Sequence, residues 1–226
     1  MTSLQQITLL LAEDHIIVRQ CLCALLTADG HFAVIGQVGT GREAVRLAQS
    51  LRPDVILMDI AMPELNGLEA TRRILSVEPT AKVIILSAHC DAAYVRRMKE
   101  IGVVGFLEKQ TSAAILTKAI LEVVGGNTFF SPSLVRHLRD DANVRRAGPD
   151  GLLYAIGDRL TSRESEVLQL IAEGSANKQI AAELAISIKT VENHRQHLME
   201  KLKVHGTAAL TRYAIAAGAI ESNGDW

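Results

Sequence analysis

Residues 7–125 alternate short apolar runs with longer segments of helical periodicity, and this alternation is the strongest constraint on the fold. The apolar runs predict β-strands at residues 7–12, 33–38, 55–58, 83–87 and 104–107. The amphipathic segments predict helices at residues 18–27, 41–50, 67–77, 92–101 and 112–124. Because helical crossovers join parallel strands with a right-handed connection, we expect an α/β domain over residues 5–125, with a parallel five-stranded sheet covered on both faces.

The pattern changes after residue 125. Residues 141–157 are rich in Gly, Asp, Arg and Ala, and we predict that residues 126–157 form a linker with one helix at about 131–140. Residues 158–222 carry no strand signal, and their helical segments are interrupted at Gly174 and near residues 186 and 205. A separate all-α domain is therefore expected at the C-terminus.

The composition fits two domains with their own cores, because the 226 residues are 48% hydrophobic and 22% charged. The longest apolar stretches fall far short of the roughly 20 residues that span a bilayer, so we expect a cytoplasmic protein with no membrane partner. Cys21, Cys23 and Cys90 lack metal-ligand spacing and are interpreted as packing residues. The net charge of −1 means that any DNA affinity must come from local charge patterning.

Polar residues stand at the carboxyl ends of four of the predicted strands. They are Glu13, Asp14, Asp59, Ser87 and Lys109. A single acid in such a place is commonly a solvated turn former. Several strand ends of a parallel sheet face one crevice, however, so the three carboxylates can converge on Mg²⁺. A hydroxyl and a lysine beside them are what a carboxylate nucleophile needs to accept a phosphoryl group.

Four segments resemble the receiver domain of response regulators: residues 11–15, 59–67, 86–88 and 105–109. The resemblance implies a flavodoxin-like (βα)5 fold, with Asp59 as phosphoacceptor. It also implies that Glu13, Asp14, Asp59 and the Ala61 backbone carbonyl hold Mg²⁺. Ser87 and Phe106 would form the family's switch pair, although Phe106 alone could be an ordinary core aromatic. Glu13 often is Asp in the family, and Gln110 stands where many relatives have Pro; neither departure removes the chemistry.

The C-terminal domain begins with a capping-box sequence at residues 161–164, which predicts the start of a helix. Further helices are expected at residues 177–185 and 189–202. In the last of these, Val191, Leu198 and Leu202 form an apolar stripe, and polar side chains occupy the opposite face. That polar face could be an ordinary solvated surface, but a short helix, a tight turn and such a helix together predict a helix-turn-helix.

Residues 160–164, 177–181, 187–194 and 201–202 resemble the LuxR-type domain of the NarL/FixJ family. The resemblance implies four helices, the last at residues 207–217, which in relatives often mediates dimerisation. The predicted DNA contacts combine cations for phosphates with polar side chains for base edges: Lys178, Lys189, Thr190, Glu192, Asn193, Gln196 and Lys201. Residues 158–226 hold eight Lys or Arg against nine Asp or Glu, so we expect modest non-specific affinity and a homodimer on repeated half-sites.

The sequence thus predicts a DNA-binding transcriptional response regulator of a two-component system. A sensor histidine kinase would phosphorylate Asp59, and the receiver would control binding to double-stranded promoter DNA. Two alternatives remain: a phosphohydrolase using the same acidic crevice, and a DNA-binding protein that does not depend on phosphorylation. We do not expect an enzyme, apart from the receiver's part in its own phosphorylation and dephosphorylation, because no separate general acid or substrate-pocket motif is evident. The complete set of receiver residues argues against the second alternative.

Overall fold

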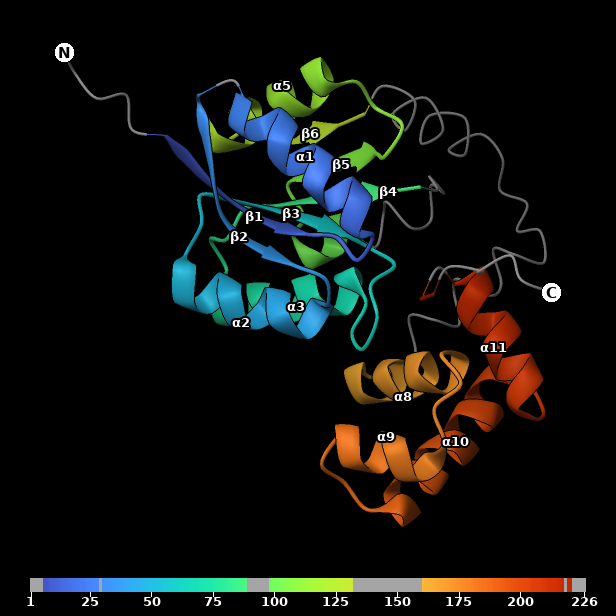
Figure 1. Cartoon of the computed structure of the whole chain (residues 1–226). Helices are drawn as coiled ribbons and strands as arrows, with labels where there is room; N and C mark the ends of the chain where they lie inside the picture. Colours follow the sequence, from blue (N-terminus) through green and yellow to red (C-terminus); the bar gives the residue numbers. More distant parts are fainter. Residues whose placement is uncertain (1–5, 29, 89–97, 132–159, 218, 221–226) are drawn as a thin grey trace, which may run out of the picture. The chain divides into compact units, whose positions relative to one another are not determined.

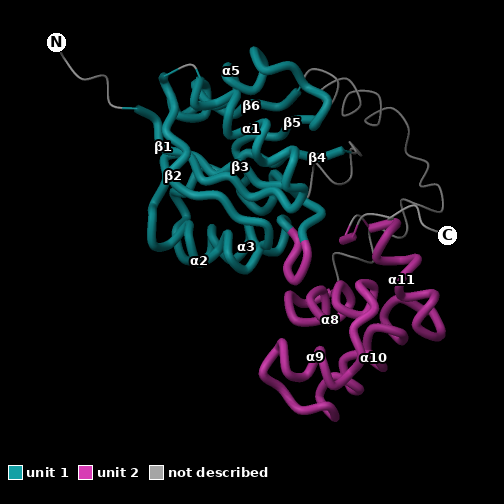
Figure 2. Tube along the Cα trace, viewed as in Figure 1, with its two compact units in different colours: residues 1–62, 67–145 teal, residues 63–66, 146–226 magenta. Residues whose placement is uncertain are grey.

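The computed structural model describes residues 6–28, 30–88, 98–131, 160–217 and 219–220 (Figure 1). The chain divides into two compact units (Figure 2). Unit 1 comprises residues 1–62 and 67–145, and unit 2 comprises residues 63–66 and 146–226.

Unit 1 contains a parallel sheet with the strand order β2-β1-β3-β4-β5-β6. Its strands are β1 Ile7–Ala12, β2 Phe32–Val38, β3 Val55–Asp59, β4 Val83–Ser87, β5 Gly105–Glu108 and β6 Phe129–Phe130. The predicted α/β flavodoxin-like class is confirmed. The order reverses at β1, and in open parallel sheets the crevice at such a reversal is the usual ligand site.

Helices cover both faces of this sheet, as Figure 1 shows. The helices are α1 Ile16–Ala28, α2 Gly41–Leu51, α3 Gly67–Val77 and α5 Ala113–Val124. Alternate strand residues point to opposite faces, so Leu9 and Leu11 pack with Leu26 of α1 and Ile120 of α5. The strands β3 and β4 are buried along their whole length, which explains their continuous apolar sequences.

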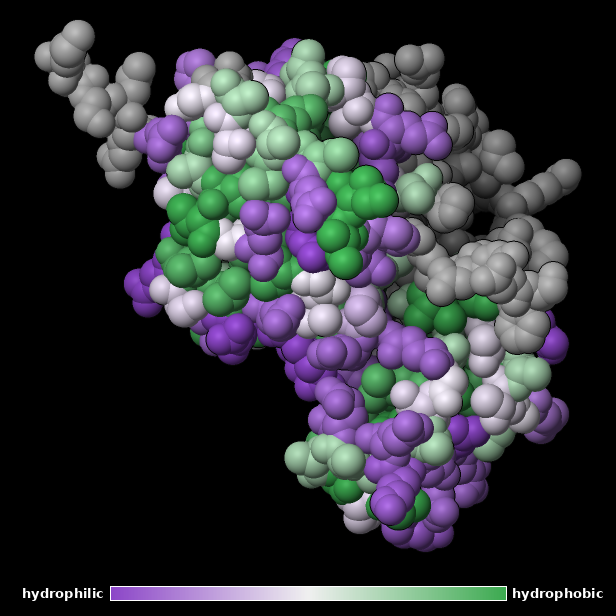
Figure 3. Space-filling model, in the orientation of Figure 1, coloured by the Kyte–Doolittle hydropathy of each residue, from purple (hydrophilic) through white to green (hydrophobic). Residues whose placement is uncertain are grey.

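Two features of unit 1 differ from the sequence expectation. The two-residue strand β6 pairs with β5 in the segment predicted to be a linker, and such a short pair leaves no periodic signal. Helix α1 begins at Ile16, two residues before the predicted start. The prediction left out Ile16 and Ile17 because these apolar residues are 61% and 77% exposed and do not fit the periodicity of a buried helix face. Figure 3 shows apolar surface over α1. The predicted helix at 92–101 is described only from residue 98, and the predicted linker helix lies almost wholly outside the described residues.

The described residues of unit 2 form four helices, as predicted. They are α8 Ser162–Ala172, α9 Asn177–Glu183, α10 Ile188–Leu202 and α11 Thr207–Ala216. Thr161 and Glu164 form the expected capping box of α8, and the Ser187 hydroxyl accepts a hydrogen bond from the Thr190 amide at the start of α10. Val191, Leu198 and Leu202 of α10 enter one core with residues of the other three helices. Within the part of the chain that the structure describes, no helix is both long and apolar enough to cross a bilayer.

Candidate functional site

The carboxyl ends of three strands, β1, β3 and β5, bring two carboxylates close to one ammonium group. Lys109 follows β5, and its Nζ lies 2.9 Å from Asp59 Oδ1 and 3.1 Å from Glu13 Oε2. Asp59 is the last residue of β3, and Glu13 directly follows β1. The parallel register therefore places on one edge of the sheet three residues that lie far apart in the sequence.

This cluster holds more negative than positive charge in a buried place. Glu13 is 0% exposed and Asp59 is 1% exposed. Burial, followed by the nearby Glu13 carboxylate, raises the pKa of Asp59 to about 6, although Lys109 opposes the shift. Burial also acts to lower the pKa of Lys109, but Asp59 and Glu13 outweigh it, and the net pKa is raised. Lys109 is thus a fixed cation, and the site retains an unneutralised carboxylate.

Asp59 has one oxygen engaged and one free of hydrogen bonds within the described residues. Its Oδ1 accepts a bond of 2.7 Å from the Ile60 amide in addition to the Lys109 contact. Its Oδ2 is buried and has no hydrogen-bond partner among the residues that the structure describes. A buried carboxylate oxygen is costly to leave unpaired, so this atom is suited to a metal ion or a phosphoryl group.

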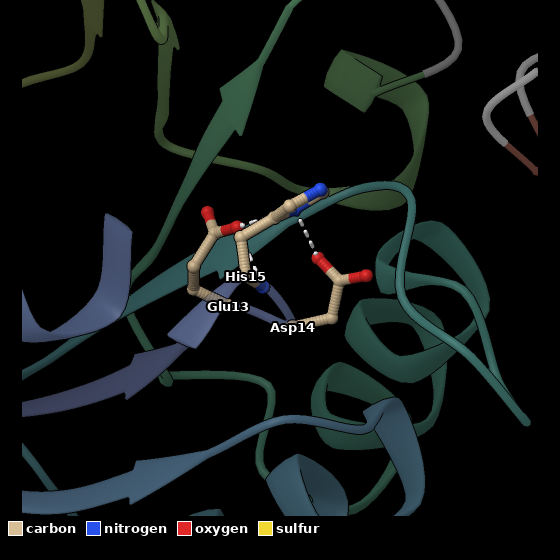
Figure 4. Close-up of side chains that lie close together, drawn as sticks. All are labelled: Glu13, Asp14 and His15. Atoms are coloured by element: carbon tan, nitrogen blue, oxygen red, sulfur yellow. Dashed lines mark hydrogen bonds and ion pairs between the residues drawn. The ribbon is translucent and has the colours of Figure 1, made fainter. Parts of the chain in front are cut away.

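Three successive residues offer metal-ligand atoms beside this cluster. The ligand atoms of Glu13, Asp14 and His15 lie within 4.8 Å of one another, and Figure 4 shows both carboxylates near the His15 ring. His15 Nδ1 lies 2.8 Å from Asp14 Oδ1, and the Asp14 charge is the main cause of a raised His15 pKa. The predicted carboxylates Glu13, Asp14 and Asp59 supply only oxygen ligands, which fits a hard cation such as Mg²⁺.

The other predicted receiver residues have distinct positions. Ser87 ends β4 and is 6% exposed, and its carbonyl accepts a 2.7 Å bond from the Lys109 amide. Phe106 lies in β5 and is fully buried, with backbone pairing to Ile85 and Phe130. Ala61 is partly buried two residues after Asp59. The role of Ser87 and Phe106 as a switch pair stays a prediction.

Sequence reasoning missed three residues that shape this site. His15 contacts both adjacent acids, and its place directly after them was the available signal. The Arg19 guanidinium donates to the backbone carbonyls of Glu13 and Asp14, one turn into α1, and nothing in the sequence distinguished it from a surface arginine. A Cβ at Gly67 would lie 1.8 Å from the Asp59 carbonyl oxygen, so only glycine lets this backbone approach Asp59.

The predicted DNA-contact residues in unit 2 fall into two groups. Lys178 on α9 and Lys189, Glu192, Asn193 and Gln196 on α10 are exposed. Lys189 Nζ lies 3.4 Å from Glu192 Oε2, and Gln196 donates a 3.0 Å bond to Glu200.

Thr190 is partly buried and the Lys201 side chain is 38% exposed, and both also have partners inside the unit. The Thr190 hydroxyl lies 2.8 Å from the Ser187 hydroxyl. Lys201 Nζ lies 2.7 Å and 2.6 Å from the two carboxylate oxygens of Glu164. Exposed side chains on α9 and α10 are therefore available to a macromolecular partner, whereas Glu164 already occupies the Lys201 ammonium group.

A receiver-like acidic crevice and a helix-turn-helix unit in one chain define a response regulator. Family comparison agrees: residues 9–121 match the response regulator receiver domain, and residues 158–214 match the luxR family of bacterial regulatory proteins. The chain therefore belongs to the LuxR-type response regulators, the transcriptional regulators that join a receiver domain to a DNA-binding helix-turn-helix domain. Both matches lie inside the predicted domains, whose outer boundaries stay predictions.

Full-length relatives support the same assignment. The chain is 34% identical to the transcriptional regulatory protein MctR of Rhizobium johnstonii over 224 residues, covering 99% of this chain and 100% of MctR. It is 38% identical to LiaR of Bacillus subtilis over 208 residues, covering 92% and 96% of the two chains. Two solved structures are similar as well. A LuxR-family response regulator from Aurantimonas sp. SI85-9A1 has a TM-score of 0.60 and 28% identity, over 62% of this chain and 100% of its own. The response regulator in an RcsB–DNA complex has a TM-score of 0.57 and 26% identity, over 94% and 99%.

Proposed function

We propose that this regulator is switched by phosphorylation of Asp59, with a sensor histidine kinase as the phosphoryl donor. The observation that carries the proposal is the Asp59 carboxylate itself, which is buried, held at Oδ1 by Lys109 and without a hydrogen-bond partner at Oδ2. In the reaction, an Asp59 oxygen forms a bond to phosphorus while the bond from phosphorus to the kinase histidine nitrogen breaks. The electron pair of the broken bond returns to that imidazole.

Glu13, Asp14, Asp59 and the Ala61 carbonyl would hold Mg²⁺ in this proposal. The ion supplies charge neutralisation for the phosphoryl oxygens and for the excess carboxylates. Lys109 remains protonated because two carboxylates face it, so it offers a fixed cation to the phosphoryl group. Arg19 donates to the carbonyls of Glu13 and Asp14, and the Gly67 amide donates to the carbonyl of Ile60, so both residues support the backbone beside the site.

The signal would leave the receiver through Ser87 and Phe106. The Ser87 hydroxyl would bond to a phosphoryl oxygen, and the fully buried Phe106 ring would be favoured in its inward position. Phosphorylation needs only to favour one of two arrangements that already exist. The receiver would also take part in its own phosphorylation by a small phosphoryl donor and in its later dephosphorylation.

The output is DNA binding through α10. Lys178, Lys189 and Thr190 would contact phosphates, and Glu192, Asn193 and Gln196 would read base edges in the major groove. Lys201 belongs to the predicted contacts too, but its present partner is Glu164. We also propose a homodimer on paired half-sites, by analogy with the structure of two RcsB dimers bound to two parallel DNAs, and a cytoplasmic location.

A DNA-binding comparison tests the whole proposal. Full-length protein is incubated with a promoter library, with and without Mg²⁺ and a small-molecule phosphoryl donor, alongside Asp59→Asn. We expect the donor to enhance sequence-specific binding by the wild type and to leave the variant unchanged. Specific binding that ignores both the donor and the Asp59 substitution would favour the phosphorylation-independent alternative.

A further inference from the structure

Two adjacent residues at the start of α8 each hold a different helix of the helix-turn-helix. The Arg163 guanidinium donates to the carbonyl of Leu184, the C-terminal cap residue of α9. The Glu164 carboxylate receives Lys201, near the C-terminal end of α10, at 2.6 Å and 2.7 Å. Neighbouring side chains on one rigid helix therefore contact both helices whose mutual angle defines the DNA-binding motif.

Glu164 is fixed more firmly than a surface carboxylate. It is 4% exposed, and it also accepts bonds of 2.9 Å and 3.0 Å from the Thr161 amide and hydroxyl in the capping box. Burial acts to raise its pKa, but Lys201 and Thr161 outweigh that effect, and the pKa is lowered. The carboxylate is thus ionised at neutral pH and oriented by the first turn of α8, so Lys201 binds to a preset position.

The position of Leu184 adds to this constraint. It directly precedes Ala185, which has a φ of 51°, in the turn between α9 and α10. Left-handed backbone in a residue other than glycine is held only by its surroundings, and the Arg163 bond is one such constraint. The angle between α9 and α10 is therefore fixed from both sides by α8.

A small change of that angle would matter at the other end of α10. The helix has 15 residues. A helix of that length extends about 22 Å, so a tilt of about 5° moves its far end by about 2 Å. Lys201 lies near the C-terminal end, whereas Lys189, Glu192 and Asn193 lie in the first turns. Bidentate contacts to base edges do not survive displacements of that size.

We propose that Arg163, Glu164 and Lys201 form a positioning clamp that sets α10 for sequence readout, and that Lys201 is a positioning residue rather than a phosphate contact. The inference rests on the DNA-binding function proposed above. A phosphate contact at Lys201 would affect the salt dependence of binding, whereas a positioning role would affect the preference for the operator. It assigns a structural anion, Glu164, to a lysine that the sequence pattern had grouped with DNA contacts.

The first test separates positioning from phosphate contact by salt dependence. Full-length wild type, Lys201→Met and Lys178→Met bind a random-sequence duplex over a series of salt concentrations. The logarithm of the binding constant falls as the logarithm of the salt concentration rises, and each lost phosphate contact makes this fall less steep by about 1. We expect that decrease for Lys178→Met and an unchanged slope for Lys201→Met. A slope lowered by about 1 in Lys201→Met, equal to that of Lys178→Met, would overturn the clamp.

The second test uses a readout that lost stability alone does not move. The ratio of affinities for a library-selected operator and the random duplex is measured for Lys201→Met, Glu164→Gln, their double variant and Lys201→Arg. A partly unfolded preparation binds both duplexes less and keeps the ratio. We expect the ratio to fall roughly tenfold in each single variant, to fall no further in the double variant and to recover in Lys201→Arg, as coupled neighbours require. An unchanged ratio in both single variants would contradict the inference. Absence of any duplex binding by the wild type would instead reject the DNA-binding function.

Discussion

Each unit of the protein contains a lysine bound to a buried carboxylate, but the two arrangements carry different net charge. In unit 1, Lys109 faces both Asp59 and Glu13, and burial with the second carboxylate raises the pKa of Asp59 to about 6. In unit 2, Lys201 faces Glu164, whose pKa is lowered despite burial. The lysine lowers the carboxyl pKa in both units, but burial and Glu13 outweigh it at Asp59, whereas Lys201 and Thr161 outweigh burial at Glu164.

The difference teaches how local charge balance separates a reactive site from a structural one. In unit 2 one carboxylate faces one lysine and also accepts hydrogen bonds from Thr161, so this pair needs no further ligand. A cluster with surplus buried carboxylate is unstable by itself, and a divalent cation and a phosphoryl group supply what it lacks.

Removal of Lys109 should have the largest effect. Lys109→Met leaves Glu13 and Asp59 buried without their shared cation, and breaking a buried ion pair in this way costs about 3–5 kcal/mol. We expect that loss in urea unfolding of metal-free protein at pH 7.5. The exposed Lys118 on α5 provides the control, since Lys118→Met should change the free energy of unfolding little. Equal stabilities of the two variants would show that the cluster is not held by Lys109.

Substitution of Asp59 should act in the opposite direction. Because the Asp59 pKa is about 6 in the folded protein and 3.8 without perturbation, ionising it at pH 7.5 costs about 3 kcal/mol of folding free energy. Asp59→Asn removes that cost, so metal-free variant should be more stable than wild type by up to that amount, as measured by urea unfolding. A phosphoacceptor variant less stable than wild type at pH 7.5 would contradict the surplus-charge account.

The stability advantage of Asp59→Asn should also depend on pH. The Asp59 contribution is fully favourable below the unfolded pKa and is lost as the pH rises through about 6. We therefore expect the stability advantage of Asp59→Asn to be small at pH 4 and to grow between pH 4 and pH 7. Thermal unfolding of both proteins across this range, in the absence of divalent ions, measures it. An advantage independent of pH would point to packing instead of charge.

The matched pair in unit 2 should give a smaller effect. Lys201→Met should lower the free energy of unfolding by about 1–2 kcal/mol, less than the change at Lys109, because the Lys201 side chain is 38% exposed and water screens it. Urea unfolding at pH 7.5 measures the loss. A loss as large as that of Lys109→Met would erase the distinction between the two sites.

The exposed pair on α10 should contribute least to stability. Lys189 and Glu192 are 79% and 49% exposed, and such a helix pair contributes about 0.2–0.5 kcal/mol. Glu192→Gln should therefore leave thermal unfolding nearly unchanged while it alters operator preference, because a glutamate accepts from cytosine and a glutamine pairs with adenine. A large thermal effect with unaltered preference would remove Glu192 from the reading surface.

The sequence predicted the elements whose signal is periodic and the residues that lie at strand ends. The continuous burial of β3 and β4 made their apolar runs unambiguous, and the strand ends placed Glu13, Asp59 and Lys109 correctly on one edge. The predicted start of α1 was wrong by two residues because Ile16 and Ile17 are exposed and lie outside the apolar periodicity. The strand β6 was missed because a pairing of two residues depends on a distant neighbour and not on local pattern.

The site shows the same limit. Contacts between side chains far apart in the chain, such as Lys201 with Glu164, cannot be read from a helical face, which shows only that a lysine is near the surface. Arg19 and Gly67 act on backbone atoms, and their importance follows from distances alone. Charge type is thus readable from sequence, whereas the partner of each charge is set by tertiary packing.

The most direct test of the central claim is mass spectrometry of the intact protein and its peptides after incubation with a small-molecule phosphoryl donor and Mg²⁺. The account predicts one phosphoryl group on wild type, located at Asp59, none on Asp59→Asn, and little labelling when the divalent ion is chelated. Labelling that persists in Asp59→Asn, or that lies elsewhere in the wild type, would contradict the assignment of the surplus-charge pocket as the phosphoacceptor site.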